Sequence, residues 1–227
     1  MVNLLSLGRG KTGSLVAQVA RERGHDVTQL GSADNARAAS LTADRLASID
    51  AVVDFTTPQA VLANIEACVT GGKNMVVGTT GWYEDLERVR QLVGKNQTGF
   101  LYGANFSIGI NVLFEAAQTA AGILQHQYLG HIFERHHAQK KDAPSGTAAT
   151  LQKIIRDTSG VEVEITSFRE GDVVGMHEVV LDSPNDTIYL CHDSKSRRGF
   201  AEGAVRAVEW LAGKRGFFDF KDVWRQT

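Results

Sequence analysis

The chain has 227 residues, with 43% hydrophobic and 22% charged side chains and a net charge of -2. This composition is typical of a globular protein with one large domain or two small ones, and it argues against a nucleic-acid-binding protein, which would be clearly basic. Cys68 and Cys191 form no CxxC pair, the N-terminus carries no signal-peptide pattern, and no apolar run reaches the ~20 residues of a membrane span. We therefore expect a reduced, cytoplasmic protein with neither a nucleic acid nor a membrane as its partner.

Short apolar runs alternate with helical patterns through the first half of the chain. Strands are expected at residues 2–7, 26–30, 51–55, 74–77 and 99–102, and helices at 12–23, 58–71 and 83–95. Strands that alternate with helices across short connections are typical of a parallel sheet. The pattern therefore predicts an α/β fold with a Rossmann-like, doubly wound parallel sheet.

The rhythm changes after Asn105. Helices are expected at residues 110–125, 145–158 and 199–211, and strands at 128–137, 161–168, 176–182 and 187–192. We interpret the last three as strands of an antiparallel sheet. The second half then forms an α+β domain inserted into the first. The expected boundaries are 1–107 and 199–227 for the first domain and 108–198 for the inserted one.

A glycine-rich motif, Gly8-Arg-Gly-Lys-Thr-Gly13, lies between the first expected strand and the first expected helix. In this context a GxGxxG pattern is typical of dinucleotide binding. Gly8 would allow the tight turn, Gly10 the close approach of a pyrophosphate, and Gly13 the packing of helix on strand. The alternative interpretation is a simple turn between strand and helix.

The sequence leaves the choice between NADH and NADPH open. An acid that holds the adenine ribose is expected about 20 residues beyond the loop, but residues 28–32 contain none and Asp34 lies further along. Arg9 and Lys11 could meet a 2′-phosphate, although both could also be solvated. The predicted cofactor is therefore NADH or NADPH.

Small and hydroxyl-bearing residues follow three further expected strands, in the segments 55–58, 78–81 and 103–107. Ligands of open α/β sheets gather at the C-terminal edge of the strands. Each segment alone could be an ordinary turn, but three on one edge favour a binding site for the nicotinamide ribose.

Residues 134–147, Glu-Arg-His-His-Ala-Gln-Lys-Lys-Asp-Ala-Pro-Ser-Gly-Thr, concentrate groups that bind or protonate anions. His136 and His137 precede Lys140, and residues 145–147 open the next expected helix, whose N–H groups could hold a carboxylate. Successive strand residues point to opposite faces, so the two histidines are not expected to share one face. Singly, these groups would be a structural histidine and a solvated lysine; together they predict a site for a small, multiply negative substrate.

Two other chemistries fit the residue types less well. His126, His131 and His136 are spaced by five residues, which matches no usual zinc-ligand spacing. Ser145 stands in Pro-Ser-Gly rather than in a Gly-x-Ser-x-Gly motif, which disfavours a Ser-His-Asp hydrolase. We therefore predict no metal site. Asp142 is expected to brace the polar loop that carries Lys140 rather than to act on the substrate.

Five segments in chain order carry a family resemblance. They are Asp54-Phe-Thr56, Gly78-Thr-Thr-Gly-Trp82, Ala104-Asn-Phe-Ser-Ile-Gly-Ile-Asn111, Glu134-x-His-His-x-x-Lys-x-Asp-Ala-Pro-Ser-Gly-Thr-Ala148 and Ser196-Arg-x-x-Phe-Ala-x-Gly-Ala-Val-Arg206. Together they resemble the 4-hydroxy-tetrahydrodipicolinate reductase family, also called dihydrodipicolinate reductases, and they span nearly the whole chain. The fourth segment is the most specific. The glycine loop is one residue shorter than the family's usual Gly-x-x-Gly-x-x-Gly, and the second-strand region lacks the usual acid.

The resemblance implies the reduction of 4-hydroxy-tetrahydrodipicolinate, a small dicarboxylate, by NAD(P)H in the diaminopimelate route to lysine. It also implies a homotetramer formed through the sheet of the inserted domain. His136 would be the acid/base and Lys140 the proton donor. The residues expected to bind substrate are His137, Gly146 and Thr147, with Ser145 added from the motif itself. The residues expected to bind the cofactor are Gly8, Arg9, Gly10, Lys11, Thr12, Gly13, Gly78, Thr79, Thr80, Gly103, Ala104, Asn105 and Phe106.

Two other functions are compatible with the sequence. An amino-acid dehydrogenase of similar two-domain build would oxidise an amino acid with NAD(P). A nucleotide-sensing protein would bind the cofactor saturably without any substrate-dependent loss of NAD(P)H.

Overall fold

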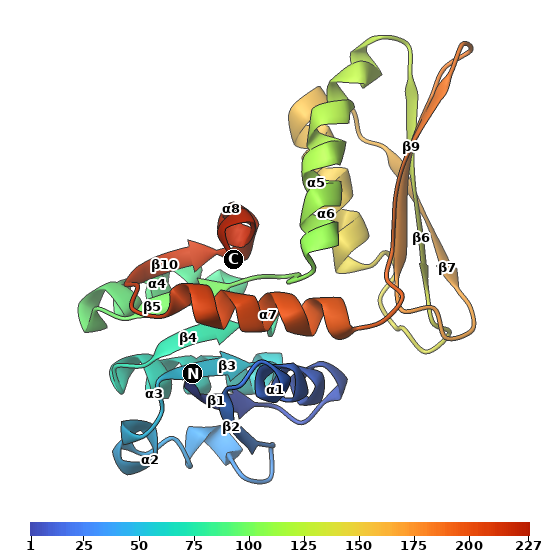
Figure 1. The fold of residues 1–227 in the computed structure, drawn as a ribbon. Helices are drawn as coiled ribbons and strands as arrows, with labels where there is room; N and C mark the ends of the chain where they lie inside the picture. Colours follow the sequence, from blue (N-terminus) through green and yellow to red (C-terminus); the bar gives the residue numbers. More distant parts are fainter. The chain divides into compact units, whose positions relative to one another are not determined.

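The computed structural model describes residues 1–227, and the chain divides into two compact units. Unit 1 comprises Met1–Ile108 and Arg198–Thr227, and unit 2 comprises Gly109–Arg197. Unit 2, coloured from green to orange in Figure 1, therefore interrupts unit 1 along the chain.

Unit 1 contains a six-stranded sheet in the order β10-β5-β4-β3-β1-β2, and every neighbouring pair is parallel. The predicted doubly wound parallel sheet is confirmed. The strands are β1 (Asn3–Leu7), β2 (Asp26–Leu30), β3 (Ala51–Asp54), β4 (Asn74–Val77), β5 (Gly99–Tyr102) and β10 (Gly216–Asp219).

Helices cover both faces of this sheet because successive strand residues point in opposite directions. Leu4 of β1 belongs to the core beneath α1 and α7, whereas Leu5 belongs to the core beneath α3 and α4. The helices of unit 1 are α1 (Lys11–Glu22), α2 (Ala43–Ala47), α3 (Pro58–Thr70), α4 (Leu86–Asn96), α7 (Arg198–Leu211) and α8 (Phe220–Val223), with 3₁₀ turns η1 (Ala36–Ala38), η2 (Tyr83–Asp85) and η4 (Trp224–Gln226).

Three features of unit 1 differ from the sequence-based expectation. β10 was not expected, and it has only four residues. Its Phe217 and Phe218 pack against opposite cores, so this short edge strand still anchors both layers. The short helices α2 and α8 were not expected either, and the expected helix at 83–95 begins as a 3₁₀ turn before α4.

Unit 2 contains a four-stranded sheet in the order β7-β6-β8-β9. The expectation of an antiparallel sheet is wrong for β7, which pairs with β6 in parallel, whereas β6–β8 and β8–β9 are antiparallel. The reason is that α6 lies between β6 and β7 in the chain, and a strand–helix–strand crossover makes its two strands parallel. The strands are β6 (Leu129–His136), β7 (Glu164–Arg169), β8 (Met176–Asp182) and β9 (Thr187–Asp193).

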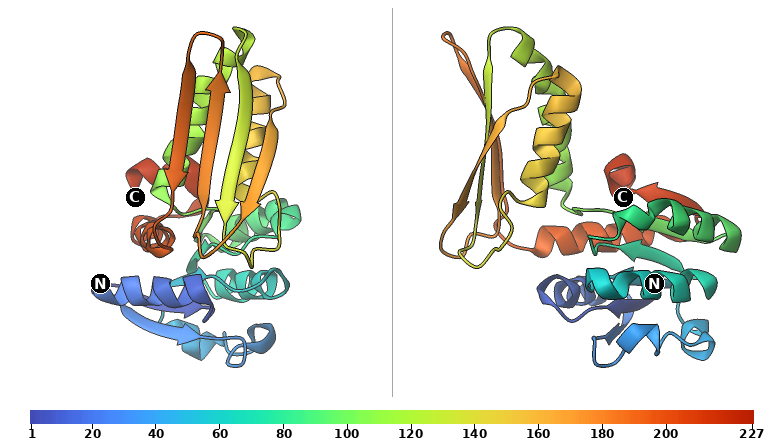
Figure 2. Two further views of the ribbon diagram at one scale, coloured as in Figure 1. Left: turned by 90° about the vertical axis from the view of Figure 1, so that its right-hand side faces the viewer. Right: turned by 180° about the vertical axis from the view of Figure 1, so that it is seen from behind.

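Helices α5 (Ile108–Ala121) and α6 (Gly146–Ser159) cover one face of this sheet, as Figure 2 shows, and α5 continues into a 3₁₀ turn, η3 (Gly122–Gln125). The opposite face exposes large apolar side chains: Leu129 is 78% exposed, Tyr189 64% and Phe168 42%. No helix in the chain is both long enough and apolar enough to cross a membrane.

Candidate active site

The glycine loop joins β1 to α1, and its three glycines have different structural roles. Gly8 has a φ of +106°, and a Cβ added there would clash with the carbonyl oxygen of Phe55. A Cβ on Gly13 would lie 2.5 Å from the carbonyl oxygen of Gly8, whereas a Cβ on Gly10 would meet nothing within 4 Å. The fold therefore requires glycine at positions 8 and 13, while Gly10 leaves space that a ligand can use.

An open cavity of about 320 Å³ lies beside this loop. It is bounded by the N-terminus of α1 and by the turns that follow β3 and β4. A helix N-terminus at the carboxyl edge of a parallel sheet favours a phosphate-bearing ligand. The cavity thus brings together the predicted residues of the glycine loop and of the turn at 78–80. The lining residues are Gly10, Lys11, Thr12, Gly13, Phe55, Thr56, Pro58, Gly78, Thr79 and Thr80.

The predicted cofactor-binding segment 103–106 does not line this cavity. Phe106 is 2% exposed, and its ring centroid lies 4.7 Å from that of Phe220 and 6.0 Å from that of Phe55. A Cβ on Gly103 would lie 2.9 Å from the Cβ of Phe220. In this structure the segment contributes packing to unit 1, and its part in cofactor binding stays a prediction.

A buried carboxylate without a predicted role ties two turns of the cavity together. Asp54, at the end of β3, has no exposed surface. It accepts hydrogen bonds from the hydroxyl groups of Thr56 and Thr79 at 2.7 and 2.6 Å, and from the side-chain amide of Asn64 at 2.8 Å. Burial raises the pKa of Asp54, and these hydrogen bonds only partly oppose that effect. Asp54 therefore fixes the positions of Thr56 and Thr79 at the cavity.

Arg9 and Asp34 form an ion pair beyond the end of β2. Nη1 of Arg9 lies 3.1 Å from Oδ2 of Asp34, with side-chain exposures of 58% and 39%. The same oxygen accepts a hydrogen bond from the N–H of Gly31 at 2.9 Å. Arg9 also donates to the carbonyl of Gln29 at 3.1 Å. The turn at 31–34 thus places the carboxylate of Asp34 beside the glycine loop. In the sequence, Asp34 lies beyond the position expected for the acid that holds the adenine ribose.

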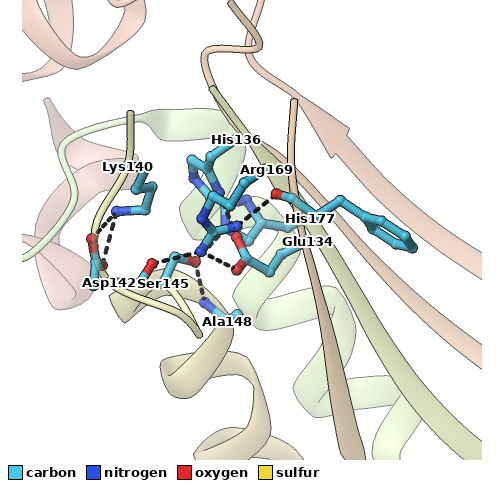
Figure 3. A network of polar contacts seen from close by, with 9 residues as sticks. Glu134, His136, Lys140, Asp142, Ser145, Ala148, Arg169 and His177 are labelled. Atoms are coloured by element: carbon cyan, nitrogen blue, oxygen red, sulfur yellow. Dashed lines mark hydrogen bonds and ion pairs between the residues drawn. The ribbon is translucent and has the colours of Figure 1, made fainter. Parts of the chain in front are cut away.

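Unit 2 contains a buried cluster of polar side chains, drawn in Figure 3. Glu134 and His136 lie two residues apart on β6 and are 0% and 8% exposed. Oε1 of Glu134 accepts a hydrogen bond from Nη2 of Arg169 at 2.7 Å, and its Oε2 is in short contact with Nδ1 of His136. Burial would raise the pKa of Glu134, but hydrogen bonds from Arg169 and Ser167 and the nearby positive charges outweigh burial and lower it. Glu134 is therefore an ionised carboxylate at neutral pH.

His177, on β8, faces His136 within this cluster, with ring centroids 5.1 Å apart. Its Nε2 lies 3.0 Å from Oγ of Ser145, the N-cap of α6, which also accepts a hydrogen bond from the N–H of Ala148 at 3.2 Å. Burial, with the neighbouring His136, lowers the pKa of His177 to about 4. Burial also lowers the pKa of His136, although Glu134 opposes the shift. Both imidazoles are therefore mostly neutral at pH 7.

The loop after β6 holds Lys140 beside this cluster. Its Nζ donates hydrogen bonds to both carboxylate oxygens of Asp142, at 2.7 and 2.8 Å. The hydrogen bond from Lys140 lowers the pKa of Asp142. The carbonyl oxygen of Asp142 accepts a further hydrogen bond from Arg169 at 2.6 Å. Asp142 thus braces the loop and fixes the ammonium group of Lys140.

The structure brings His136, Lys140 and Ser145 together. The Ser145 side chain is 2% exposed and caps α6, and its part in substrate binding stays a prediction. His137 follows β6, and its Nδ1 has no hydrogen-bond partner. Gly146 is exposed and Thr147 is half-buried in the first turn of α6.

Three members of the cluster had no predicted role: Glu134, Arg169 and His177. Strand alternation alone could have paired Glu134 with His136, because residues two apart on a strand share a face. Arg169 and His177 lie on β7 and β8, so only the pairing of those strands with β6 brings them near. Glu134, His136 and His177 bring atoms of the kind that bind metals within 4.8 Å. However, both carboxylate oxygens of Glu134 are already engaged within the cluster, one by Arg169 and the other by His136.

The doubly wound parallel sheet, with a glycine loop and a cavity at the carboxyl ends of its strands, is the architecture of a dinucleotide-binding protein. Combined with an acid–base cluster in a second unit, it defines an oxidoreductase that uses a pyridine nucleotide. The chain belongs to the dihydrodipicolinate reductase family, and the predicted resemblance is confirmed. Residues 7–106 match the family model "Dihydrodipicolinate reductase, N-terminus", and residues 109–224 match "Dihydrodipicolinate reductase, C-terminus".

Two similar proteins illustrate the relationship, and both are named 4-hydroxy-tetrahydrodipicolinate reductase. The protein of Christiangramia forsetii is 38% identical over 236 residues, covering 98% of this chain and 97% of its own length. The protein of Laribacter hongkongensis is 36% identical over 198 residues, covering 78% of this chain and 74% of its own length.

Solved structures share the fold at lower identity. A dipicolinate-bound dihydrodipicolinate reductase from Paenisporosarcina sp. TG-14 has a TM-score of 0.80 at 22% identity, covering 98% of this chain and 100% of that one. An amine dehydrogenase from Mycobacterium smegmatis has a TM-score of 0.63 at 8% identity, covering 97% and 95%. These structures support the same two-unit architecture.

Proposed function

We propose that this oxidoreductase reduces 4-hydroxy-tetrahydrodipicolinate to tetrahydrodipicolinate with NADH or NADPH, in the diaminopimelate route to lysine. The observation that carries the proposal is the cluster in unit 2, where the His136 imidazole lies near Lys140 and faces His177, whose Nε2 is 3.0 Å from Oγ of the N-cap Ser145 of α6. Such a site suits a small dicarboxylate that must accept a proton. The relatives named for this reaction support the choice of substrate.

In the proposed reaction the substrate gains a hydride and a proton and loses water. The dinucleotide, when bound, supplies the hydride. Lys140, whose ammonium group Asp142 fixes, donates the proton, and His136 assists as acid/base. The first turn of α6 holds one substrate carboxylate, since a helix N-terminus attracts anions. His137 contributes a further polar contact.

The proposal assigns each unit a part in turnover. Residues 1–107 and 199–227 bind the dinucleotide at the glycine loop, and residues 108–198 bind the substrate. The cavity residues Lys11, Thr12 and Thr80 are suited to phosphate and ribose oxygens because they offer an ammonium group and two hydroxyl groups.

A direct assay tests this function. Purified protein is given 4-hydroxy-tetrahydrodipicolinate generated enzymatically in the cuvette, and the oxidation of NADH and of NADPH is followed side by side. Substrate-dependent oxidation is expected with at least one of them. If both cofactors bind but neither is oxidised, the chain is a nucleotide-sensing protein and the proposal is wrong.

Thr147→Val tests the carboxylate site. The change keeps the shape of the side chain but removes a hydroxyl group that we place on one substrate carboxylate. Hydrogen bonds to charged groups contribute roughly 1.5–3 kcal/mol, so KM for the substrate and the inhibition constant of pyridine-2,6-dicarboxylate should rise about 10- to 100-fold. Cofactor affinity should stay at the parent value.

The control for this variant is Ser145→Ala, because Ser145 is the N-cap of α6. Loss of an N-cap typically costs about 0.5–2 kcal/mol of stability, so this control should lower Tm. A Thr147→Val protein with lower Tm but unchanged KM and inhibitor affinity would show that Thr147 serves the helix and not the substrate.

We further propose that the protein accepts both NADH and NADPH, because Arg9 and Asp34 offer groups for either. The carboxylate of Asp34 can accept hydrogen bonds from the ribose hydroxyls of NADH, and the guanidinium of Arg9 can pair with the 2′-phosphate of NADPH. Their mutual ion pair is half-exposed, so either partner can turn to a ligand at small cost.

Single replacements should separate the two cofactors. Arg9→Ala should weaken NADPH about 10- to 100-fold more than NADH, and Asp34→Asn should weaken NADH more than NADPH. Kd values from fluorescence titration give the ratios. Asp44→Asn, which removes an acid from the exposed first turn of α2, is the control. Equal losses for both cofactors in Arg9→Ala would contradict this assignment.

We also propose that the protein is a cytoplasmic homotetramer. The outer face of the unit 2 sheet exposes Leu129, Phe168 and Tyr189, and exposed apolar side chains on one face favour association. Light scattering on the parent protein and on a Leu129→Lys, Tyr189→Lys double variant measures the assembly. A monomeric parent would exclude the tetramer.

A further inference from the structure

The burial of the Glu134–Arg169 ion pair costs hydration free energy, and packing alone does not explain why the pair is there. Glu134 has no exposed surface, and the side chain of Arg169 is 18% exposed. A buried ion pair generally stabilises a fold no better than apolar residues of similar volume, because both charges lose their hydration. The pair directly contacts His136 through the second carboxylate oxygen. Its position therefore points to a role in the chemistry of that imidazole.

The hydrogen-bonding chemistry of Glu134 determines which nitrogen of His136 carries the proton. An ionised carboxylate only accepts hydrogen bonds, so Nδ1 of His136, in contact with Oε2, must be the protonated nitrogen. In the neutral ring Nε2 then keeps its lone pair. A Cβ at position 175 would lie 3.0 Å from Nε2, so the glycine at this position keeps that nitrogen uncrowded.

Arg169 holds the carboxylate in the orientation that this contact needs. Its Nη2 donates both to Oε1 of Glu134 and to the carbonyl of Asp142, at 2.7 and 2.6 Å, and its Nη1 donates to the carbonyl of Phe168 at 2.7 Å. With Oε1 occupied, Oε2 is directed at His136. Through its bond to the carbonyl of Asp142, the same guanidinium also links the cluster to the loop that carries Lys140.

We propose that Glu134, oriented by Arg169, is a positioning residue that fixes the Nδ1–H tautomer of His136 and directs its Nε2 to the substrate. The inference rests on the proposed function of His136 as acid/base. Neither Glu134 nor Arg169 touches the substrate in this scheme. Both act through the imidazole, as a carboxylate does when it orients a catalytic histidine.

Charged and titratable groups approach His136 from several elements of unit 2. Glu134 approaches it on β6, Arg169 from β7, His177 from β8 and Lys140 from the following loop, while His192 lies behind His177 on β9. Burial, Lys140 and Arg169 lower the pKa of His136, and Glu134 alone in this set raises it. Removing the carboxylate should therefore lower the pKa further.

Nuclear magnetic resonance on the whole protein with ¹⁵N-labelled histidine tests the proposal without any turnover. Long-range ¹H–¹⁵N correlations report which ring nitrogen is protonated, and His136→Asn identifies the signal. The parent should show the Nδ1–H form of His136 at pH 7. A parent with the Nε2–H form would overturn the proposal, and this measurement requires no variant of Glu134 to fold.

Glu134→Gln gives the second measurement. Arg169 needs an acceptor, so the amide oxygen faces Arg169 and the amide N–H₂ faces His136, which must then accept at Nδ1 and carry its proton on Nε2. We expect this exchange of tautomer and a fall in the pKa of His136, because the carboxylate that raises it is removed. Turnover should fall on the order of 10²-fold with little change in KM. Glu134→Asp, which restores the charge, should recover part of the turnover.

Glu170→Gln is the matched control, because Glu170 follows β7, is 57% exposed and pairs with Arg135 at 2.9 Å. It should leave tautomer, pKa and turnover unchanged. A Glu134→Gln protein with parental tautomer and turnover would refute the positioning role. A parent that shows the expected tautomer but reduces no substrate would instead refute the proposed function, so the two failures are distinguishable.

Discussion

Replacing Lys140 by alanine should lower kcat by about 10²–10⁴-fold, the usual effect of losing a positioned proton donor. In the structure Nζ of Lys140 is fixed by two hydrogen bonds to Asp142, and the side chain is 22% exposed. The group is therefore both ordered and accessible to a ligand. Steady-state assays with saturating cofactor and substrate measure the loss, and cofactor binding and Tm should stay at parental values.

The neighbouring lysine provides the control for this replacement. Lys141 is exposed and directly follows Lys140, so Lys141→Ala removes the same charge from the same loop. It should retain parental kcat. A Lys140→Ala protein with near-parental kcat would show that another group protonates the substrate, and His136 would then be the next residue to test.

The sequence predicted most of unit 1 well because β1, β3, β4 and β5 are short, largely buried runs that end at turns. Strands at 26–30, 74–77 and 99–102 have the predicted bounds. A buried parallel strand needs apolar residues on both faces, and this leaves a clear pattern. β10 left no such pattern, because its four residues are only partly buried and the first of them is Gly216, which has a φ of +127°.

Unit 2 was harder to predict because the order of strands in a sheet depends on pairing between segments that are distant in the sequence. The sequence indicates the elements, including the helix between β6 and β7, but β7 runs parallel to β6 because that helix forms a crossover between them. That order places Arg169 beside β6. Without it, the partner of Glu134 could not be inferred from residues 134–147 alone.

The same reason separates the predicted from the missed site residues. His136, Lys140 and Ser145 lie within one short segment, so local chemistry predicted them. His177 joins them only because β8 pairs with β6. Asp54 was part of a recognised motif, but its hydrogen bonds to Thr56 and Thr79 depend on how the ends of β3 and β4 adjoin. Local sequence therefore predicts the site residues that lie within one segment, and strand pairing adds those that lie on other strands.

The glycine loop allows a strong test of cofactor binding. Gly10→Val should weaken both NADH and NADPH by about 10²-fold, because the added side chain occupies space at the start of α1 and removes one or two charge-assisted hydrogen bonds of roughly 1.5–3 kcal/mol each. The variant should still fold, since Gly10 has a φ of -72° and a Cβ there meets no atom within 4 Å. Fluorescence or calorimetric titration gives the affinities, and thermal unfolding reports the fold.

Two other glycines make this result interpretable. Gly94→Val introduces the same side chain in α4, where a Cβ also meets nothing within 4 Å, away from the residues that line the cavity. It should bind both cofactors with parental affinity. Gly13→Ala should instead lower stability, because its Cβ would lie 2.5 Å from the carbonyl oxygen of Gly8. If Gly10→Val folds and binds both dinucleotides as tightly as Gly94→Val does, the loop is only a turn between β1 and α1, and the dinucleotide must bind elsewhere.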